Sequence, residues 1–192
     1  EFRRVLFRSV QFLILGFCMG ICQGFAIMVS QSFGAKRLDE MHTYIYAGAV
    51  WTAITAFVVS ILVVVFCADI LHILQVNDEI FKDAYAYLVV IFAGIPFTLL
   101  YNYLSAILRA IGDSKTPFLF LAFSAVLNIG LDFFCILVLK WGCAGAAIAT
   151  IFAQAVSGIL CLLLIAFKVN VLHIPKSSRY VDKNHSIKLL AM

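Results

Sequence analysis

Residues 124–137, SAVLNIGLDFFCIL, form an apolar run that carries one carboxylate, Asp132, and one amide, Asn128. The run lies within a longer apolar segment, 117–139, which is long enough to cross a bilayer as a helix. A charged side chain near the middle of such a helix costs roughly 2.5–3.5 kcal/mol on insertion scales. The segment therefore predicts a membrane-spanning helix whose polar residues serve a purpose.

The composition of the whole chain agrees with a membrane protein. Of the 192 residues, 64% are hydrophobic and 12% are charged, and the mean hydropathy is +1.06. A soluble domain carries about 25% charged residues, so this chain has too little polar surface for a water-soluble globule. The net charge of +4 is small and indicates no nucleic-acid partner.

Five apolar segments are long enough to span a bilayer as helices. They cover residues 11–33, 45–68, 85–109, 117–139 and 143–167. Every backbone amide in hydrocarbon must be hydrogen-bonded within the protein, which favours an all-α, polytopic membrane helical bundle. Pro96 should bend the third segment, because proline lacks the backbone N–H of a regular helix.

The two ends of the chain do not look like natural protein termini. Residues 1–9, EFRRVLFRS, resemble the translation of a sequencing-library adaptor, and we exclude them from fold reasoning. At the other end, SIKLLAM stops at the start of another apolar stretch. We therefore expect a fragment that is cut at both ends.

The positions of Lys and Arg predict the orientation of the bundle. Nine fall on one side, namely Lys36, Arg37, Arg109, Lys115, Lys168, Lys176, Arg179, Lys183 and Lys188. Only Lys82 and Lys140 fall on the other side. Cytoplasmic loops carry the excess of positive residues, so we expect loops 34–44 and 110–116 and the C-terminal tail to be cytoplasmic.

Some small residues are interpreted as packing features. Gly16, Gly20 and Gly24 recur every four residues, a spacing that lets a neighbouring membrane helix approach closely. The six cysteines form no CxxC pair, and no histidine joins them at metal-ligand spacing. We interpret them as small buried hydrophobes.

Polar side chains follow one face on each of two neighbouring segments. The first stripe is Ser124, Asn128 and Asp132, and the second is Thr150, Gln154 and Ser157. Residues spaced by three or four share a helix face. Asp132 and Thr150 are each nine residues from Trp141, so in a hairpin they should lie at similar depth.

These groups offer two interpretations. A carboxylate, an amide oxygen and a hydroxyl can hold a proton or a hard cation such as Na⁺. They can also form a hydrogen-bonded clamp between helices, with Asp132 permanently protonated. An ionisable residue deep in a membrane favours the functional interpretation.

Several stretches carry a family likeness. SQSFGAKR (30–37), ILRAIGDSKTP (107–117), NIGLDFFCIL (128–137) and GCAGAAIAT (142–150) stand in this order between the expected helices. On these pieces the chain resembles the multidrug and toxic compound extrusion (MATE) transporters across nearly all of 10–192.

The resemblance implies an architecture and an activity. Family members have twelve helices in two lobes and export organic cations and other amphipathic compounds in exchange for H⁺ or Na⁺. Residues 10–172 would be helices two to six of the first lobe, and 173–192 the inter-lobe loop and the start of the next helix. The resemblance implies a transporter rather than an enzyme, with no cofactor, monomeric when complete, in the bacterial inner membrane. The fragment alone is expected to be inactive, because the family's first helix and second lobe are missing.

The resemblance also implies site residues. One branch of the family binds a proton or cation in its first lobe with an Asn and an Asp on the fifth helix, a Thr on the sixth and a Tyr on the fourth. Asn128, Asp132 and Thr150 match three of these positions. Tyr87 matches the fourth less directly, since Tyr85 is a near neighbour.

Two other functions are less well supported. A lipid-linked oligosaccharide flippase of the same broad superfamily would present cationic residues to a central cavity, whereas Lys and Arg here stand at the ends of the segments. An intramembrane aspartyl protease needs two embedded aspartates that share a proton, and only Asp132 lies well inside a segment. The sequence therefore favours an ion-coupled antiporter.

Overall fold

The computed structural model describes residues 2–73, 76–169 and 172. The expected inter-lobe loop at 173–192 lies outside these residues. The described elements are α1 (Phe2–Gly34), α2 (Leu38–Val65), α3 (Cys67–Ile73), α4 (Asp78–Ala93), α5 (Ile95–Ala110), α6 (Lys115–Phe133), the π-helical turn η1 (Phe134–Val138) and α7 (Gly142–Lys168). Because α1 begins at Phe2, the helix includes most of the residues that were set aside as adaptor-like.

The structure confirms an all-α membrane bundle. Four stretches are long and apolar enough to cross a bilayer: Phe12–Gly34, Leu38–Val65, Lys115–Val138 and Gly142–Lys168. Ile80–Ala93 and Ile95–Ala110, which meet at a bend of 43°, pass the same test together and make a fifth candidate span. The bend lies beside Pro96, where the sequence predicted it.

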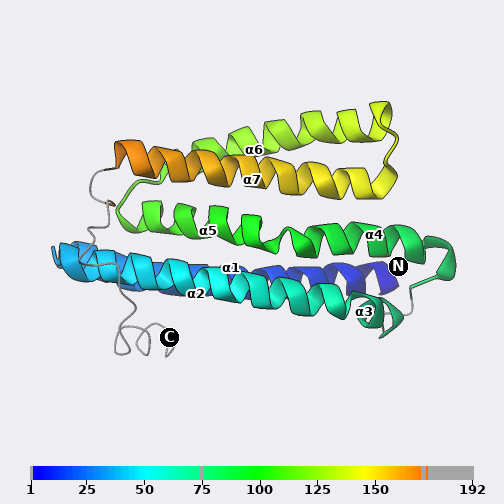
Figure 1. The fold of residues 1–192 in the computed structure, drawn as a ribbon, viewed down its shortest axis with the longest axis horizontal. Helices are drawn as coiled ribbons and strands as arrows, with labels where there is room; N and C mark the ends of the chain where they lie inside the picture. The colour runs from blue at the N-terminus through cyan, green and yellow to red at the C-terminus, as the bar shows by residue number, and fades with distance from the viewer. Residues whose placement is uncertain (1, 74–75, 170–171, 173–192) are drawn as a thin grey trace.

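The helices lie side by side along one long axis (Figure 1). The broken α4–α5 pair lies between the α1–α2 pair and the α6–α7 pair. Helix α5 packs against α1, α2 and α7, while α7 packs against α4, α5 and α6. Helix α7 therefore connects the broken span to the helix that carries Asp132.

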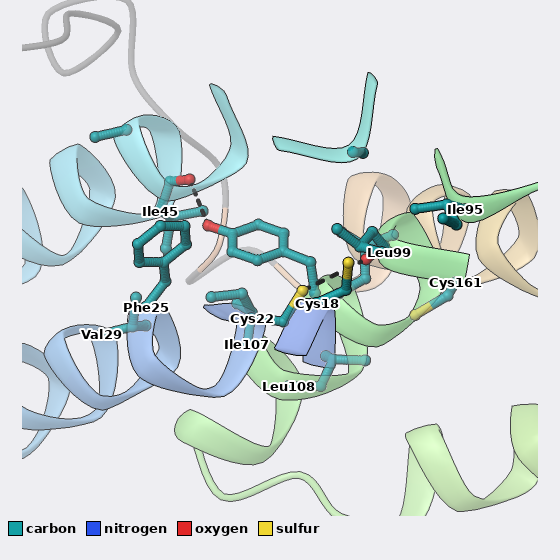
Figure 2. Packing of buried hydrophobic residues seen from close by; sticks show 14 of the residues in the cluster. Cys18, Cys22, Phe25, Val29, Ile45, Ile95, Leu99, Ile107, Leu108 and Cys161 are labelled. Carbon is teal, nitrogen blue, oxygen red and sulfur yellow. Dashed lines mark hydrogen bonds between the residues drawn. The ribbon is translucent and has the colours of Figure 1, made fainter. Parts of the chain in front are cut away.

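The core forms where α1, α2 and α5 meet (Figure 2). Cys22 and Leu99 are almost fully buried there, and the Cys22 thiol lies 3.9 Å from the Leu99 carbonyl oxygen. The Tyr103 hydroxyl donates to the Ile45 carbonyl at 2.7 Å, which ties α5 to α2. Five of the six cysteines are buried, as predicted, and Cys143 is exposed.

The glycine ridge of α1 is not used within the described part of the chain. A Cβ built on Gly16, Gly20 or Gly24 meets nothing within 4 Å. The predicted close approach of a neighbouring helix is therefore absent among the described elements. The ridge forms an open face of the bundle.

The segment expected to be one loop between the second and third spans is partly helical. It contains α3 and the first turns of α4. Cys67 and Leu71 are fully buried, and the His72 ring lies 4.8 Å from the ring of Phe81. Burial of these apolar side chains holds the short helix against the bundle.

Candidate functional site

Asn128 and Thr150 meet at the interface of α6 and α7. The Asn128 side-chain amide donates to the Thr150 hydroxyl oxygen at 3.2 Å. That hydroxyl in turn donates to the Ala146 carbonyl, one helical turn back, at 2.9 Å. The two polar stripes, whose relative rotation the sequence left open, therefore face each other at this point.

The register of the hairpin differs from the prediction. Thr150 lies level with Asn128 rather than with Asp132, which is one turn nearer the α6–α7 connection. The reason is the end of α6, where the chain forms a wider π turn: the Leu139 amide bonds to the Phe134 carbonyl at 3.1 Å. This turn and the residues up to Trp141 use more residues per unit of depth than a regular helix does.

Asp132 has an incompletely satisfied carboxylate. Its Oδ1 atom is buried and has no hydrogen-bond partner among the described residues. The side chain lines an open groove of about 320 Å³ together with Ile129, Phe133, Ile136 and Leu137. In an apolar setting an unpartnered carboxylate oxygen is costly unless a proton, a cation or a donor from elsewhere meets it.

Tyr87 lies at nearly the same depth as Asp132. Helices α4 and α7 run in the same direction (Figure 1), and the side chain of Ile151 lies at Gly94. Seven residues before this contact, Tyr87 is level with Ala144. Counting four residues outward from the Asn128–Thr150 contact places Asp132 level with Ala146. The two depths differ by about 3 Å at the usual rise per residue.

No hydrogen bond in the described part of the chain joins Tyr87 to Asn128, Asp132 or Thr150. Its side chain is partly buried and packs against the apolar core. The structure therefore brings Asn128 and Thr150 into contact, while for Asp132 and Tyr87 a similar depth follows only from counting residues along the helices. The described residues contain no cluster of three or more His, Cys, Asp and Glu side chains that could hold a metal ion.

Polar contacts at the α4–α5 break were not predicted. The hydroxyl of Thr98 bonds to the side-chain oxygen of Gln154, so the second polar stripe faces α5 as well as α6. Ser60 donates to the Phe92 carbonyl at 2.8 Å. The signal for such contacts is the missing N–H of Pro96, which frees a carbonyl, but the sequence does not say which helix supplies the donor.

The bundle and its intramembrane polar groups define a multi-pass α-helical membrane protein. A family model described as MatE matches residues 5–134. The chain belongs to this family, as the resemblance predicted.

Two curated relatives come from Bacillus subtilis (strain 168). The "Probable multidrug resistance protein YpnP" is 32% identical over 184 residues, covering 94% of this chain and 41% of the relative. The "Probable multidrug resistance protein YoeA" is 27% identical over 186 residues, covering 94% of this chain and 40% of the relative.

A solved structure has the same fold. It is the inward-facing conformation of a multidrug resistance MATE family transporter of the MOP superfamily, with a TM-score of 0.89 at 21% sequence identity. The match covers 97% of this chain and 42% of that chain. The chain thus spans about 40% of the length of the curated relatives it matches.

Proposed function

We propose that this chain is part of a secondary antiporter that exports amphipathic or cationic small molecules in exchange for H⁺ or Na⁺. The observation that carries the proposal is the buried Oδ1 of Asp132, which has no partner among the described residues although it lies within a membrane span. The names of the relatives, which describe multidrug resistance, support the class of substrate.

In the proposed mechanism, Asp132 exchanges a proton or Na⁺ during the transport cycle. Asn128 and Thr150 supply further oxygen atoms one helical turn away, and Tyr87 can add a phenol oxygen from α4. Oxygen ligands of this kind suit a small hard cation. Binding of the ion favours one conformation of the transporter, and its release favours the other.

The test is the substitution Asp132→Asn in the full-length protein. We expect ion-driven efflux of a fluorescent organic cation from proteoliposomes to fall on the order of tenfold, the usual scale of coupling between two ligands. Asp69→Asn is the matched control, because Asp69 is an exposed carboxylate on α3, outside the spans. Undiminished ion-driven efflux in Asp132→Asn would remove Asp132 from the mechanism.

A further inference from the structure

The break between α4 and α5 is satisfied by a neighbouring helix. Pro96 has no N–H, so the Phe92 carbonyl four residues earlier loses its helical donor. The Ser60 hydroxyl of α2 donates to this carbonyl at 2.8 Å, and Ser60 itself is buried. The Phe92 carbonyl therefore has a donor within the protein, which helps the bend to persist inside a membrane.

Helix α7 packs against the α4–α5 break on the side opposite to α2. At Gly94, where the two helices meet, a Cβ would lie only 2.0 Å from Cδ1 of Ile151. Ile151 thus fills the space that the missing side chain leaves open. One turn later along α5, the buried Thr98 hydroxyl bonds to the side-chain oxygen of Gln154 and approaches the Gly94 carbonyl at 3.4 Å.

One turn of α7 therefore contacts both α6, at Asn128, and the α4–α5 break. Residues 150–154, which we call the coupling turn, begin with Thr150, bonded to Asn128 of α6. They continue with Ile151, which lies at Gly94, and end with Gln154, which bonds to Thr98. The half-helix beyond the break, α4, carries Tyr87 two turns from Gly94.

We propose that the coupling turn transmits the charge state of Asp132 to the α4–α5 break, with Ile151 and Gln154 acting as positioning residues. The proposal rests on the proposed function in one respect: Asp132 must gain and lose a cation or proton. A shift of Thr150 with Asn128 moves Ile151 and Gln154 on the same helical turn. These residues set the angle of α4 at Gly94, and α4 in turn places Tyr87 relative to Asp132. Thermodynamic linkage requires the coupling to be reciprocal: the charge state of Asp132 affects the α4–α5 break, and the break affects ion binding at Asp132.

The alternative is that these contacts are packing without communication. The two cases differ in additivity: independent sites have additive effects, whereas coupled sites do not. A double-mutant cycle between Asp132 and Gln154 therefore separates them. Asp132→Asn keeps the shape of the side chain and removes its charge, and Gln154→Leu keeps its approximate size and removes the oxygen that Thr98 meets.

The measurement is amide hydrogen exchange of the full-length protein in lipid nanodiscs, read for peptides across Ile95–Leu99. We expect Asp132→Asn to change exchange there by about threefold or more when Gln154 is present, and to change it by less than half as much in Gln154→Leu, as coupled sites require. Gln23→Leu is the matched control, since Gln23 is an exposed glutamine of the α1 span.

Thr98→Val removes the same hydrogen bond from the other partner, so it replaces Gln154→Leu if that variant fails to fold. Equal effects of Asp132→Asn with and without Gln154 would overturn the coupling. So would an effect confined to peptides of α6 and α7. Either result leaves the proposed function standing, because the efflux of Asp132→Asn tests that function separately.

Discussion

At the scale of single residues, Gly94 is the glycine with the least room for a side chain. An added methyl would overlap three of the four side-chain carbons of Ile151, with Cδ1 at 2.0 Å, Cγ1 at 2.4 Å and Cγ2 at 2.9 Å. We predict that Gly94→Ala lowers the free energy of unfolding by about 1–3 kcal/mol, as overpacking of a close-packed site does. Thermal unfolding in detergent measures the change. Adding Ile151→Ala to Gly94→Ala should restore part of the loss.

Gly130→Ala is the control for this prediction. Gly130 lies inside α6, and a Cβ there meets nothing within 4 Å. The variant should match or slightly exceed the wild-type unfolding temperature, because alanine favours a helix over glycine. Equal destabilisation by the two substitutions would mean that Ile151 does not determine the cost at Gly94.

The contacts between single residues were partly predictable. The four-residue spacing of polar groups predicted one polar stripe on each of α6 and α7 but did not fix the rotation of either helix; in the structure Asn128 and Thr150 meet. The predicted depth of Asp132 relative to Thr150 was wrong by one turn. The reason is that the apolar sequence of Phe134–Val138 does not distinguish a π turn from an α-helix. Ser60 gave no signal either, since a serine in an apolar run does not reveal which carbonyl it meets.

At the scale of elements, the start of α6 depends on Asp113. Its Oδ1 accepts the backbone N–H of Thr116 at 3.1 Å, and hydrogen bonds from Thr116 hold the pKa of the Asp113 carboxyl below its usual value. The lowered pKa means that the unfolded chain binds the proton more tightly. The contribution is therefore present at neutral pH and is lost as the pH falls below about 4 and through the lowered pKa of the folded state.

We predict that Asp113→Ala destabilises the protein by about 1 kcal/mol at pH 7, the usual cost of a lost helix cap. The difference in unfolding temperature between wild type and Asp113→Ala should shrink as the pH falls below about 4, because protonation of the carboxylate removes the ionised cap. Asp113→Asn is the control, because asparagine also caps helices but does not titrate. A difference that stays constant with pH would contradict an ionised cap.

Hydropathy predicted the order of the membrane spans, but it did not predict every short helix and break between and within them. Five apolar segments predicted five spans, and Pro96 predicted the bend of the third. Hydropathy missed α3, because seven residues with two buried side chains are too short to show a period. Ile151, which fills the space beside Gly94, is 57 residues further along the chain, so local sequence patterns do not reveal this contact.

At the scale of the whole molecule, two faces of the bundle are open among the described residues. The α1 ridge meets no described neighbour, and α6 is exposed along most of its length. Part of this surface suits lipid, whereas a ridge of small residues suits another helix. This agrees with a chain that spans about 40% of the length of its curated relatives.

The orientation of the bundle gives the last prediction, and the native cysteines provide the probe. Cys143 is exposed at the end of the molecule that carries the α6–α7 connection, while the other five cysteines are buried. The distribution of Lys and Arg predicts that this end faces outward. A membrane-impermeant maleimide added to intact cells should therefore modify the peptide that contains Cys143, and Cys143→Ser should remove that modification. A cysteine introduced at the exposed Ser114, in the opposite loop, should react only after the membrane is permeabilised. Labelling of Ser114→Cys, but not of Cys143, in intact cells would reverse the orientation and place Asp132 in the cytoplasmic half of the membrane.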